Sequence, residues 1–451
     1  NMAEIKKILI ANRGEIVQRA IRTIREMGKK SVAVYSAGDK NASYLKHADE
    51  AVCIGGAKSS ESYLNIPAII TAAEMTGCDA IFPGYGFLSE NQDFVEICRL
   101  HNIKFIGPSV EVMEKMADKS KAKEEMIRAG VPVVPGSKGA VHSVTEGKVV
   151  AAEIGYPIMA KAAAGGGGRG MRLIKEESEF DQLFMAASSE ALAAFGDGTM
   201  YLERFINNPR HIEVQVVGDS HGNAIHIGER DCSLQRRHQK VIEESPAILL
   251  NDETRAKLHE VAVKATKYLK YEGAGTFEFL ADDKQNIYFM EMNTRLQVEH
   301  PVSEMVSGID IVELMIKVAE GEKVPPQESI KFRGHAIECR ITAEDPNSFL
   351  PCPGKVTQWM VPGGRNVRVD SHVYTNYIVP PHYDSMIGKL IVWGRDRNKA
   401  INIMKRALAE FEVEGIKTTI PFHQKMMENE DFISNNYDTK YLENYKNLDE
   451  L

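Results

Sequence analysis

Residues 291–299 have the sequence EMNTRLQVE, in which five polar side chains alternate with mostly apolar ones. On an extended backbone, side chains two residues apart point to the same side. One face of such a strand would carry two carboxylates, two amides and a guanidinium, from Glu291, Asn293, Arg295, Gln297 and Glu299. A solvated strand face can show the same alternation, but it usually favours Lys, Thr and Ser. The set at 291–299 is suited to binding a metal ion and an anion together.

A second strand is expected just before this one. Residues 275–280 (GTFEFL) are separated from residues 287–290 (IYFM) by the turn-like ADDKQN, a pattern typical of a β-hairpin. The hairpin places Glu278 nearly opposite Glu291. Two carboxylates and an amide oxygen on adjacent strands suit Mg²⁺, a hard cation that takes oxygen ligands and leaves room for phosphates.

Size and composition restrict the class of protein. A chain of 451 residues exceeds one hydrophobic core, so we expect two to four domains. The net charge of −8 argues against nonspecific binding of nucleic acid. No apolar run approaches the roughly 18 residues of a membrane span, and residues 2–10 lack the features of a signal peptide. The six cysteines are scattered without CxxC spacing, so we expect reduced thiols and a cytoplasmic protein.

Alternating strands and helices at the start of the chain indicate a parallel sheet. Strands are expected at 7–11, 31–35, 80–82 and 104–106, with a helix at 15–27. The first turn, ANRGE, lacks the pattern G-x-G-x-x-G, which disfavours a dinucleotide site. We therefore expect a Rossmann-like first domain over residues 1–115.

The pattern changes at about residue 116. A second domain is expected over 116–330, with a strand at 156–161 and a helix from Asn251 to about Lys270. Linker-like residues 321–328 precede a β-rich third domain over 331–446, which closes with a helix at about 397–412. The fold class is thus a mixture of α/β and α+β.

Four consecutive glycines, residues 165–168, follow a predicted strand that ends at Lys161. Glycine costs backbone entropy, so a close approach to a ligand or a need for mobility has to compensate. Backbone N–H groups in such a loop can surround phosphate oxygens, and Lys161 adds a positive charge. A flexible linker is the alternative, but linkers usually contain serine. We interpret residues of about 133–206 as a mobile lid whose edge is this loop.

Two further charged segments have open interpretations. Residues 229–240 (ERDCSLQRRHQK) and 208–215 (NPRHIEVQ) are solvated faces or, together, a site in which His211, His238 and Lys240 meet a ribose and an anion. Arg340 either forms a surface salt bridge with Glu338 or has a functional role.

Several motifs together resemble biotin carboxylase, the ATP-grasp component of the biotin-dependent carboxylases. They are NRGE (12–15), PGYGFLSEN (83–91), the glycine loop, RRHQK (236–240), EMNTRLQVEHP (291–301) and YDSMIGK (383–389). The resemblance is colinear from Lys7 to about Tyr441. It implies an N-terminal pre-ATP-grasp domain, an ATP-grasp domain with a mobile lid, and a C-terminal domain that completes the site.

The resemblance also implies roles for individual residues. Contacts to ATP are implied for Lys119, Lys161, Gly167, Gly168, Met171, Glu203, Arg204, Ile206, His211, Gln235, His238, Glu278 and Ile416. Mg²⁺ or Mn²⁺ would be held by Glu278, Glu291 and Asn293. Bicarbonate would lie among Lys240, Arg295, Gln297 and Val298, with Glu299 as the base. Biotin would be met by Tyr85 and Arg340. The catalytic group would be Arg295, Glu299, Lys240 and Arg340.

The expected partners follow from the same resemblance. The carrier motif Ala-Met-Lys-Met is absent and no carboxyltransferase-sized region follows residue 451, so we expect a separate subunit that carboxylates biotin on a biotin carboxyl carrier protein. A carboxyltransferase partner and a homodimer are also implied. Acetyl-CoA carboxylase of fatty acid synthesis is the expected assembly, and a two-subunit pyruvate carboxylase is the alternative.

Two rival functions share part of this pattern. Another ATP-grasp ligase, of the carbamoyl-phosphate or purine pathway, would keep the metal and phosphate residues but would not require Arg340. A regulatory module that binds ATP without turnover would tolerate loss of Arg295 and Glu299, yet both are present.

Overall fold

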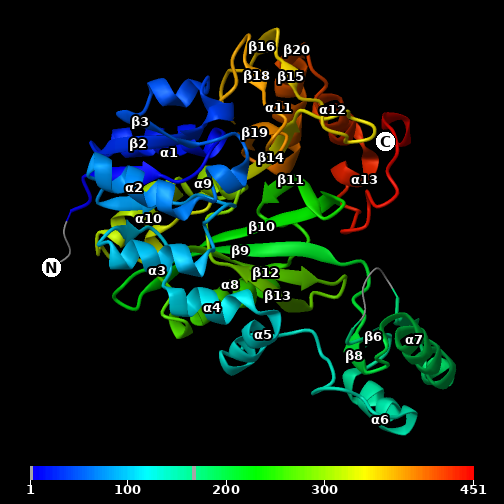
Figure 1. Cartoon of the computed structure of the whole chain (residues 1–451). Helices are drawn as coiled ribbons and strands as arrows, with labels where there is room; N and C mark the ends of the chain where they lie inside the picture. The colour runs from blue at the N-terminus through cyan, green and yellow to red at the C-terminus, as the bar shows by residue number, and fades with distance from the viewer. Residues whose placement is uncertain (1–3, 165–168) are drawn as a thin grey trace.

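The computed structural model describes residues 4–164 and 169–451, and its first part is a parallel sheet flanked by helices (Figure 1). The strands are β1 (Lys7–Ile10), β2 (Lys30–Ser36), β3 (Glu50–Gly55), β4 (Ala80–Phe82) and β5 (Lys104–Phe105), in the order β3-β2-β1-β4-β5. The helices are α1 (Glu15–Glu26), α2 (Ile66–Thr76), α3 (Gln92–Leu100) and α4 (Val110–Ala117). The predicted parallel sheet is confirmed. Its strand order reverses between β1 and β4, and ligands bind outside such a point.

The centre of the molecule is an eight-stranded antiparallel sheet in the order β13-β12-β9-β10-β11-β14-β19-β17. Its strands are β9 (Arg210–Gly218), β10 (Ala224–Arg236), β11 (Gln239–Ser245), β12 (Gly273–Ala281), β13 (Ile287–Asn293), β14 (His335–Thr342), β17 (Val367–Ser371) and β19 (Met386–Gly394). It is packed against α8 (Asp252–Tyr268), α9 (His300–Ser307), α10 (Ile311–Ala319) and α11 (Arg397–Glu410). Because β11 pairs with β14, the sheet continues across the expected boundary at residue 330.

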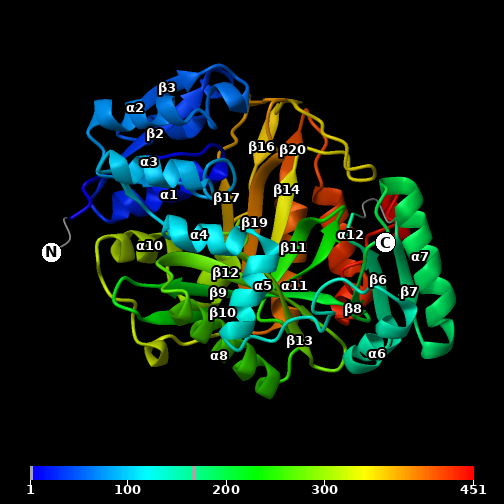
Figure 2. The same ribbon diagram turned by 60° about the horizontal axis from the view of Figure 1, so that its bottom comes forward.

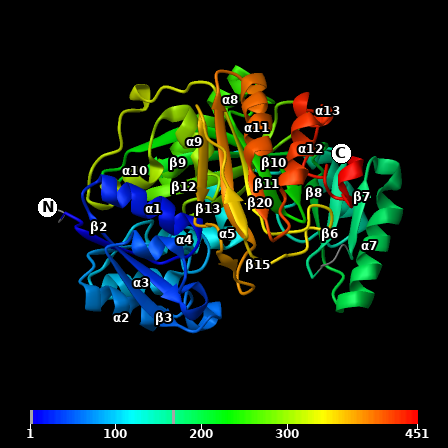
Figure 3. The ribbon, with the colours of Figure 1, turned by 90° about the horizontal axis from the view of Figure 1, so that it is seen from above.

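Smaller elements complete the C-terminal part. Two short ladders join β15 (Gly354–Lys355) to β18 (Ile378–Val379) and β16 (Gln358–Met360) to β20 (Glu412–Glu414), and α12 (Ile420–Glu428) and α13 (Glu430–Ile433) follow. Figure 3 shows these elements between the N-terminal sheet and a small third sheet. Among the helices that the structure describes, none combines the length and the apolar character needed to cross a membrane.

The third sheet projects from the main body and has its own core. It contains β6 (Ile158–Ala162), β7 (Met171–Ile174) and β8 (Met200–Arg204) in the order β7-β6-β8, covered by α6 (Val144–Ile154) and α7 (Phe180–Phe195). Figures 1 and 2 show it at the end of an extended connection from α5 (Lys119–Arg128). Its buried apolar residues form a cluster separate from the other cores. Gly167 and Gly168, predicted to cover ATP, lie outside the described residues.

The predicted hairpin is confirmed, but the alternating segment at 291–299 is only partly a strand. Glu278 and Glu291 are direct partners in the β12–β13 ladder. The strand ends at Asn293. The next residue turns toward Glu90 of the N-terminal part, whose carboxylate accepts hydrogen bonds from the backbone N–H and hydroxyl of Thr294 at 3.1 and 2.9 Å. This tertiary contact overrides the local alternation.

Candidate active site

A cavity of about 630 Å³ lies where the three parts of the chain meet. Its lining includes the loops after β1 and β4, the tip of the β10–β11 hairpin, and residues 382–386 of the C-terminal part. Gly14, with φ of +82°, allows the sharp turn from β1 into α1 beside it. Seven of the predicted residues line this cavity: Tyr85, His238, Lys240, Arg295, Gln297, Val298 and Arg340.

Lys240 is the electrostatic centre of the buried wall beside this cavity. Its ammonium group lies 2.7 Å from Glu299, 3.1 Å from Glu213 and 3.1 Å from Glu278. Burial lowers the pKa of Lys240, but Glu213 and Glu299 outweigh that effect and hold it well above its usual value. Arg230, which is completely buried, donates to Glu213 at 2.8 Å and gives that carboxylate a second cation.

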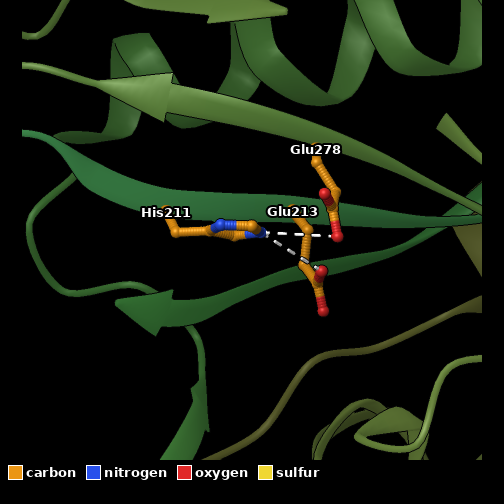
Figure 4. A group of neighbouring side chains, drawn as sticks. All are labelled: His211, Glu213 and Glu278. Carbon is orange, nitrogen blue, oxygen red and sulfur yellow. Dashed lines mark ion pairs between the residues drawn. The ribbon is translucent and has the colours of Figure 1, made fainter. Parts of the chain in front are cut away.

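His211 projects from β9 toward the same carboxylates (Figure 4). Its Nε2 lies 3.5 Å from Glu278 and 3.7 Å from Glu213. Burial alone would lower the pKa of His211, but the contacts to Glu213 and Glu278 raise it to about 9. His211 is thus a cation near neutral pH. These three side chains are close enough to share a metal ion, but Lys240 already forms ion pairs with both carboxylates.

The pair Glu278 and Glu291 fits a divalent metal better. Burial raises the pKa of Glu291 to about 7, and the neighbouring carboxylate of Glu278 adds to this shift. The raised pKa marks a place where negative charge lacks a cation. Asn293 lies on the same strand, and its amide group donates to Glu278 at 2.8 Å. These oxygen donors on adjacent strands therefore fit Mg²⁺.

Arg295, Gln297 and Val298 lie on the loop between β13 and α9. Arg295 donates from Nε to Glu90 at 2.8 Å and from Nη1 to the side-chain oxygen of Gln297 at 3.1 Å. Buried Lys389 donates to the backbone carbonyl of Val298 at 2.8 Å and so fixes the loop. The loop therefore presents a guanidinium and an amide at the cavity.

Glu299 and Arg340 form an ion pair at the inner end of the cavity. Glu299 is fully buried and accepts a hydrogen bond from Arg340 Nη2 at 3.0 Å in addition to its contact with Lys240. Arg340 Nε donates to Glu243 on β11 at 2.5 Å. The predicted alternative, a salt bridge between Arg340 and Glu338, does not form. On the N-terminal side, the hydroxyl of Tyr85 donates to Glu15.

Several of the residues predicted to contact ATP lie on the small sheet or on the strands of the main body next to it. Lys161 on β6 pairs with Glu203 on β8 at 2.5 Å, and Arg204 Nη1 donates to Tyr288 of β13 at 3.2 Å. Gln235 contacts His211 at 3.2 Å. Others in this region are Lys119 at the start of α5, Met171 on β7 and Ile206 after β8. Ile416 is not brought into this group; it packs against the C-terminal core.

Sequence reasoning missed several charged residues that organise the site. Glu213, Arg230, Glu243 and Lys389 are all fully buried. Glu213 had a detectable signal, because it follows His211 at the same two-residue spacing on one strand face. Arg230 and Lys389 lie in segments that the sequence singled out, 229–240 and 383–389, but their partners cannot be read from those segments. Glu243 carries no local signal, since its partner Arg340 is distant in the sequence.

Comparisons with known families agree with this architecture. Residues 4–113 match the biotin carboxylase N-terminal domain, residues 118–327 match the ATP-binding domain of the carbamoyl-phosphate synthase L chain, and residues 338–444 match the biotin carboxylase C-terminal domain. Biotin carboxylase of Nostoc sp. is 56% identical over 97% of this chain and 98% of its own length. A pyruvate carboxylase component of Methanothermobacter thermautotrophicus is 52% identical over 98% of this chain and 90% of its own length.

Solved structures are similar over nearly the whole chain. A biotin carboxylase complex from Campylobacter jejuni with β,γ-ATP shares 68% identity, with a TM-score of 0.86 and coverage of 98% of this chain and 99% of that one. The biotin carboxylase domain dimer of Hydrogenobacter thermophilus 2-oxoglutarate carboxylase, with MgADP, ADP and bicarbonate, shares 48%, with a TM-score of 0.83 and coverage of 98% of each. Fold and site thus define an ATP-grasp ligase. The chain belongs to the biotin carboxylase family, whose members use ATP, Mg²⁺ and bicarbonate to carboxylate biotin.

Proposed function

We propose that the buried ion-pair network performs the bicarbonate half of this reaction. Arg295 and Gln297 hold bicarbonate at the cavity, and Glu299 accepts its proton. The resulting dianion attacks the γ-phosphate of ATP, the bond from that phosphorus to the β,γ-bridging oxygen breaks, and carboxyphosphate and ADP are formed. The observation that carries this proposal is the position of Glu299, fully buried between Lys240 at 2.7 Å and Arg340 at 3.0 Å. The two cations hold the Glu299 carboxylate in a fixed position, where it can accept the bicarbonate proton as a general base.

The nucleotide and its metal would be held on either side of this network. Lys161, Glu203 and His211 would lie on the nucleotide side. Glu278 and Glu291 would hold Mg²⁺, which would neutralise part of the negative charge of the phosphates. Residues of about 133–206 form the proposed lid. Their separate core supports motion as one body, and closure would exclude water from a labile intermediate.

Arg340 is proposed to face biotin. Its guanidinium lines the cavity outside the metal and phosphate group, and its side chain is still 18% exposed. A guanidinium can stabilise the enolate-like oxygen that develops on the ureido ring when N1′ loses its proton. Tyr85, on the opposite wall, would complete the biotin pocket.

We further propose that the biotin arrives on a separate carrier protein in the cytoplasm and that the chain works as a homodimer with a carboxyltransferase partner. The cavity opens to solvent beside residues 382–386, which supports delivery from outside. Acetyl-CoA is the proposed final acceptor. A pyruvate carboxylase is the second candidate, favoured by the 52% identity to the pyruvate carboxylase component of Methanothermobacter thermautotrophicus.

Phosphate release tests the proposal directly. The protein is incubated with ATP, Mg²⁺ and bicarbonate, with and without free biotin. Biotin-dependent release supports the assignment, and release that is indifferent to biotin or absent refutes it. Glu299→Gln should abolish release in both conditions, whereas Glu244→Gln, a buried glutamate bonded to Arg397 away from the cavity, is the matched control. Supplying carrier and carboxyltransferase with acetyl-CoA or pyruvate then decides the acceptor.

A further inference from the structure

Two buried carboxyl groups lie directly behind Arg340. Glu243 on β11 and Glu338 on β14 are cross-strand partners, and neither has exposed surface. Glu243 Oε1 accepts the 2.5 Å hydrogen bond from Arg340 Nε. Glu243 Oε2 and both carboxyl oxygens of Glu338 receive no hydrogen bond from any donor within the described residues. Three buried acceptor oxygens are thus left without a donor.

Among the residues that the structure describes, Arg340 is the cation that forms an ion pair with a member of this pair, Glu243. Glu338 and Arg340 are two residues apart on β14 and share a face, on which Lys389 of β19 stands opposite Arg340. Lys389 is already committed, because its ammonium group lies 3.0 Å from Glu15 and donates to the carbonyl of Val298. In the part of the chain that the structure describes, the other charged groups that act on the pair are Arg340 and Glu299. The thiol of Cys339 on β14 interacts with both carboxyl groups, and the thiol of Cys232 on β10 interacts with Glu243.

Electrostatics make two ionised carboxylates untenable here. Burial raises the pKa of Glu338 well above its usual value, and the adjacent Glu243 adds to that shift. Burial also raises the pKa of Glu243, although Arg340 opposes it. When two carboxyl groups interact this closely, they titrate as a unit and the first proton belongs to the pair. One proton would also satisfy the orphaned oxygens, since the acid of one residue can donate to the free oxygen of the other.

We propose that Glu243 and Glu338 share one proton and act as a singly charged positioning unit that holds Arg340 toward the biotin side of the cavity. This inference rests on the proposed role of Arg340. The proposal explains why Arg340 is bonded to two carboxylates, Glu243 and Glu299. When Glu299 takes a proton from bicarbonate, its contact with Arg340 changes from an ion pair to a weaker hydrogen bond between a cation and a neutral acid. Glu243 keeps its charge at that moment, so the guanidinium stays in place for the second half-reaction.

Three variants test the positioning role in the full-length protein. Glu243→Gln removes the charge that holds Arg340, and its kcat/KM for free biotin should fall about 10- to 100-fold, the scale for supporting partners of a functional group. Bicarbonate-dependent ATP cleavage without biotin should fall much less. Glu338→Ala should likewise lower kcat/KM for free biotin more than ATP cleavage without biotin. Glu338→Gln keeps a neutral hydrogen-bond donor, so it should retain most of the activity with biotin that Glu338→Ala loses. Glu244→Gln is the matched control because its side chain points to the opposite face of β11.

Infrared difference spectroscopy tests the proton itself. At neutral pH the spectrum of the wild type minus Glu338→Gln should contain a carbonyl band of a protonated carboxylic acid. Absence of that band overturns the inference. The inference is also overturned if Glu244→Gln loses biotin carboxylation over ATP cleavage to the same extent as Glu243→Gln. If Arg340→Ala loses biotin carboxylation but Glu243→Gln does not, only the inference fails. If Arg340→Ala leaves the biotin reaction unaltered, the proposed function of Arg340 fails. If Glu243→Gln does not fold, the infrared comparison still decides.

Discussion

Replacing Arg340 by alanine should separate the two halves of the reaction. The transition state for biotin carboxylation would lose one guanidinium donor, which costs about 10²–10³ in rate, or roughly 2.7–4 kcal/mol. ATP cleavage with bicarbonate alone should fall much less, because Lys240 still holds Glu299 at 2.7 Å. Arg340→Lys should be an incomplete substitute, since it keeps the charge but loses the planar fork that reaches both Glu243 and Glu299.

The same substitution has a structural cost that must be measured separately. Removing Arg340 leaves Glu243 without its cation, and breaking a buried ion pair costs about 3–5 kcal/mol. Glu299 retains Lys240, and the partner Glu338 can supply a proton, so we expect a value near the lower limit, about 3 kcal/mol. Urea unfolding gives the stability, and phosphate release with and without biotin gives the two rates. If both rates decline by the same factor in a folded variant, the assignment of Arg340 to biotin is wrong.

Three further predictions concern other parts of the molecule. Glu291→Gln should raise the Mg²⁺ concentration needed for ATP cleavage while the fold is kept, because Glu291 faces Glu278 across the hairpin; an unaltered Mg²⁺ titration would contradict the metal role. Nucleotide should increase protection from hydrogen exchange across residues of about 133–206, and equal protection in both states would exclude lid closure. Burial opposes ionisation of Glu244, yet His335 and Arg397 lower its pKa to about 2. Its folded pKa is depressed, so its contribution of about 3 kcal/mol should be present above about pH 4.5 and vanish as the pH falls toward 2. Comparing Glu244→Gln with the wild type by urea unfolding at pH 7 and pH 3 checks this; an unchanging difference would refute it.

Local patterns predicted a large part of the fold and the site. The βαβ alternation predicted the parallel sheet, and the turn ADDKQN predicted the hairpin that sets Glu278 opposite Glu291. Both rest on interactions between residues close in the sequence, where side-chain periodicity and turn chemistry are sufficient. Lys240 and His238 also line the cavity, but the local pattern of their segment left a solvated face open, and only the family resemblance assigned them to a site.

Partners distant in the sequence decided the rest. The strand that begins at residue 287 ends at Asn293 because the next residue, Thr294, is hydrogen-bonded to Glu90. Glu90 lies 204 residues earlier in the sequence. The β11–β14 pairing joins parts that composition separates at residue 330. Side-chain spacing by itself therefore determined which residues share a strand face, while tertiary packing alone decided which charges are buried together. Burial strengthens electrostatic interaction and removes the competing water, so Glu243 and Glu338 acquire a shared role only where β11 meets β14.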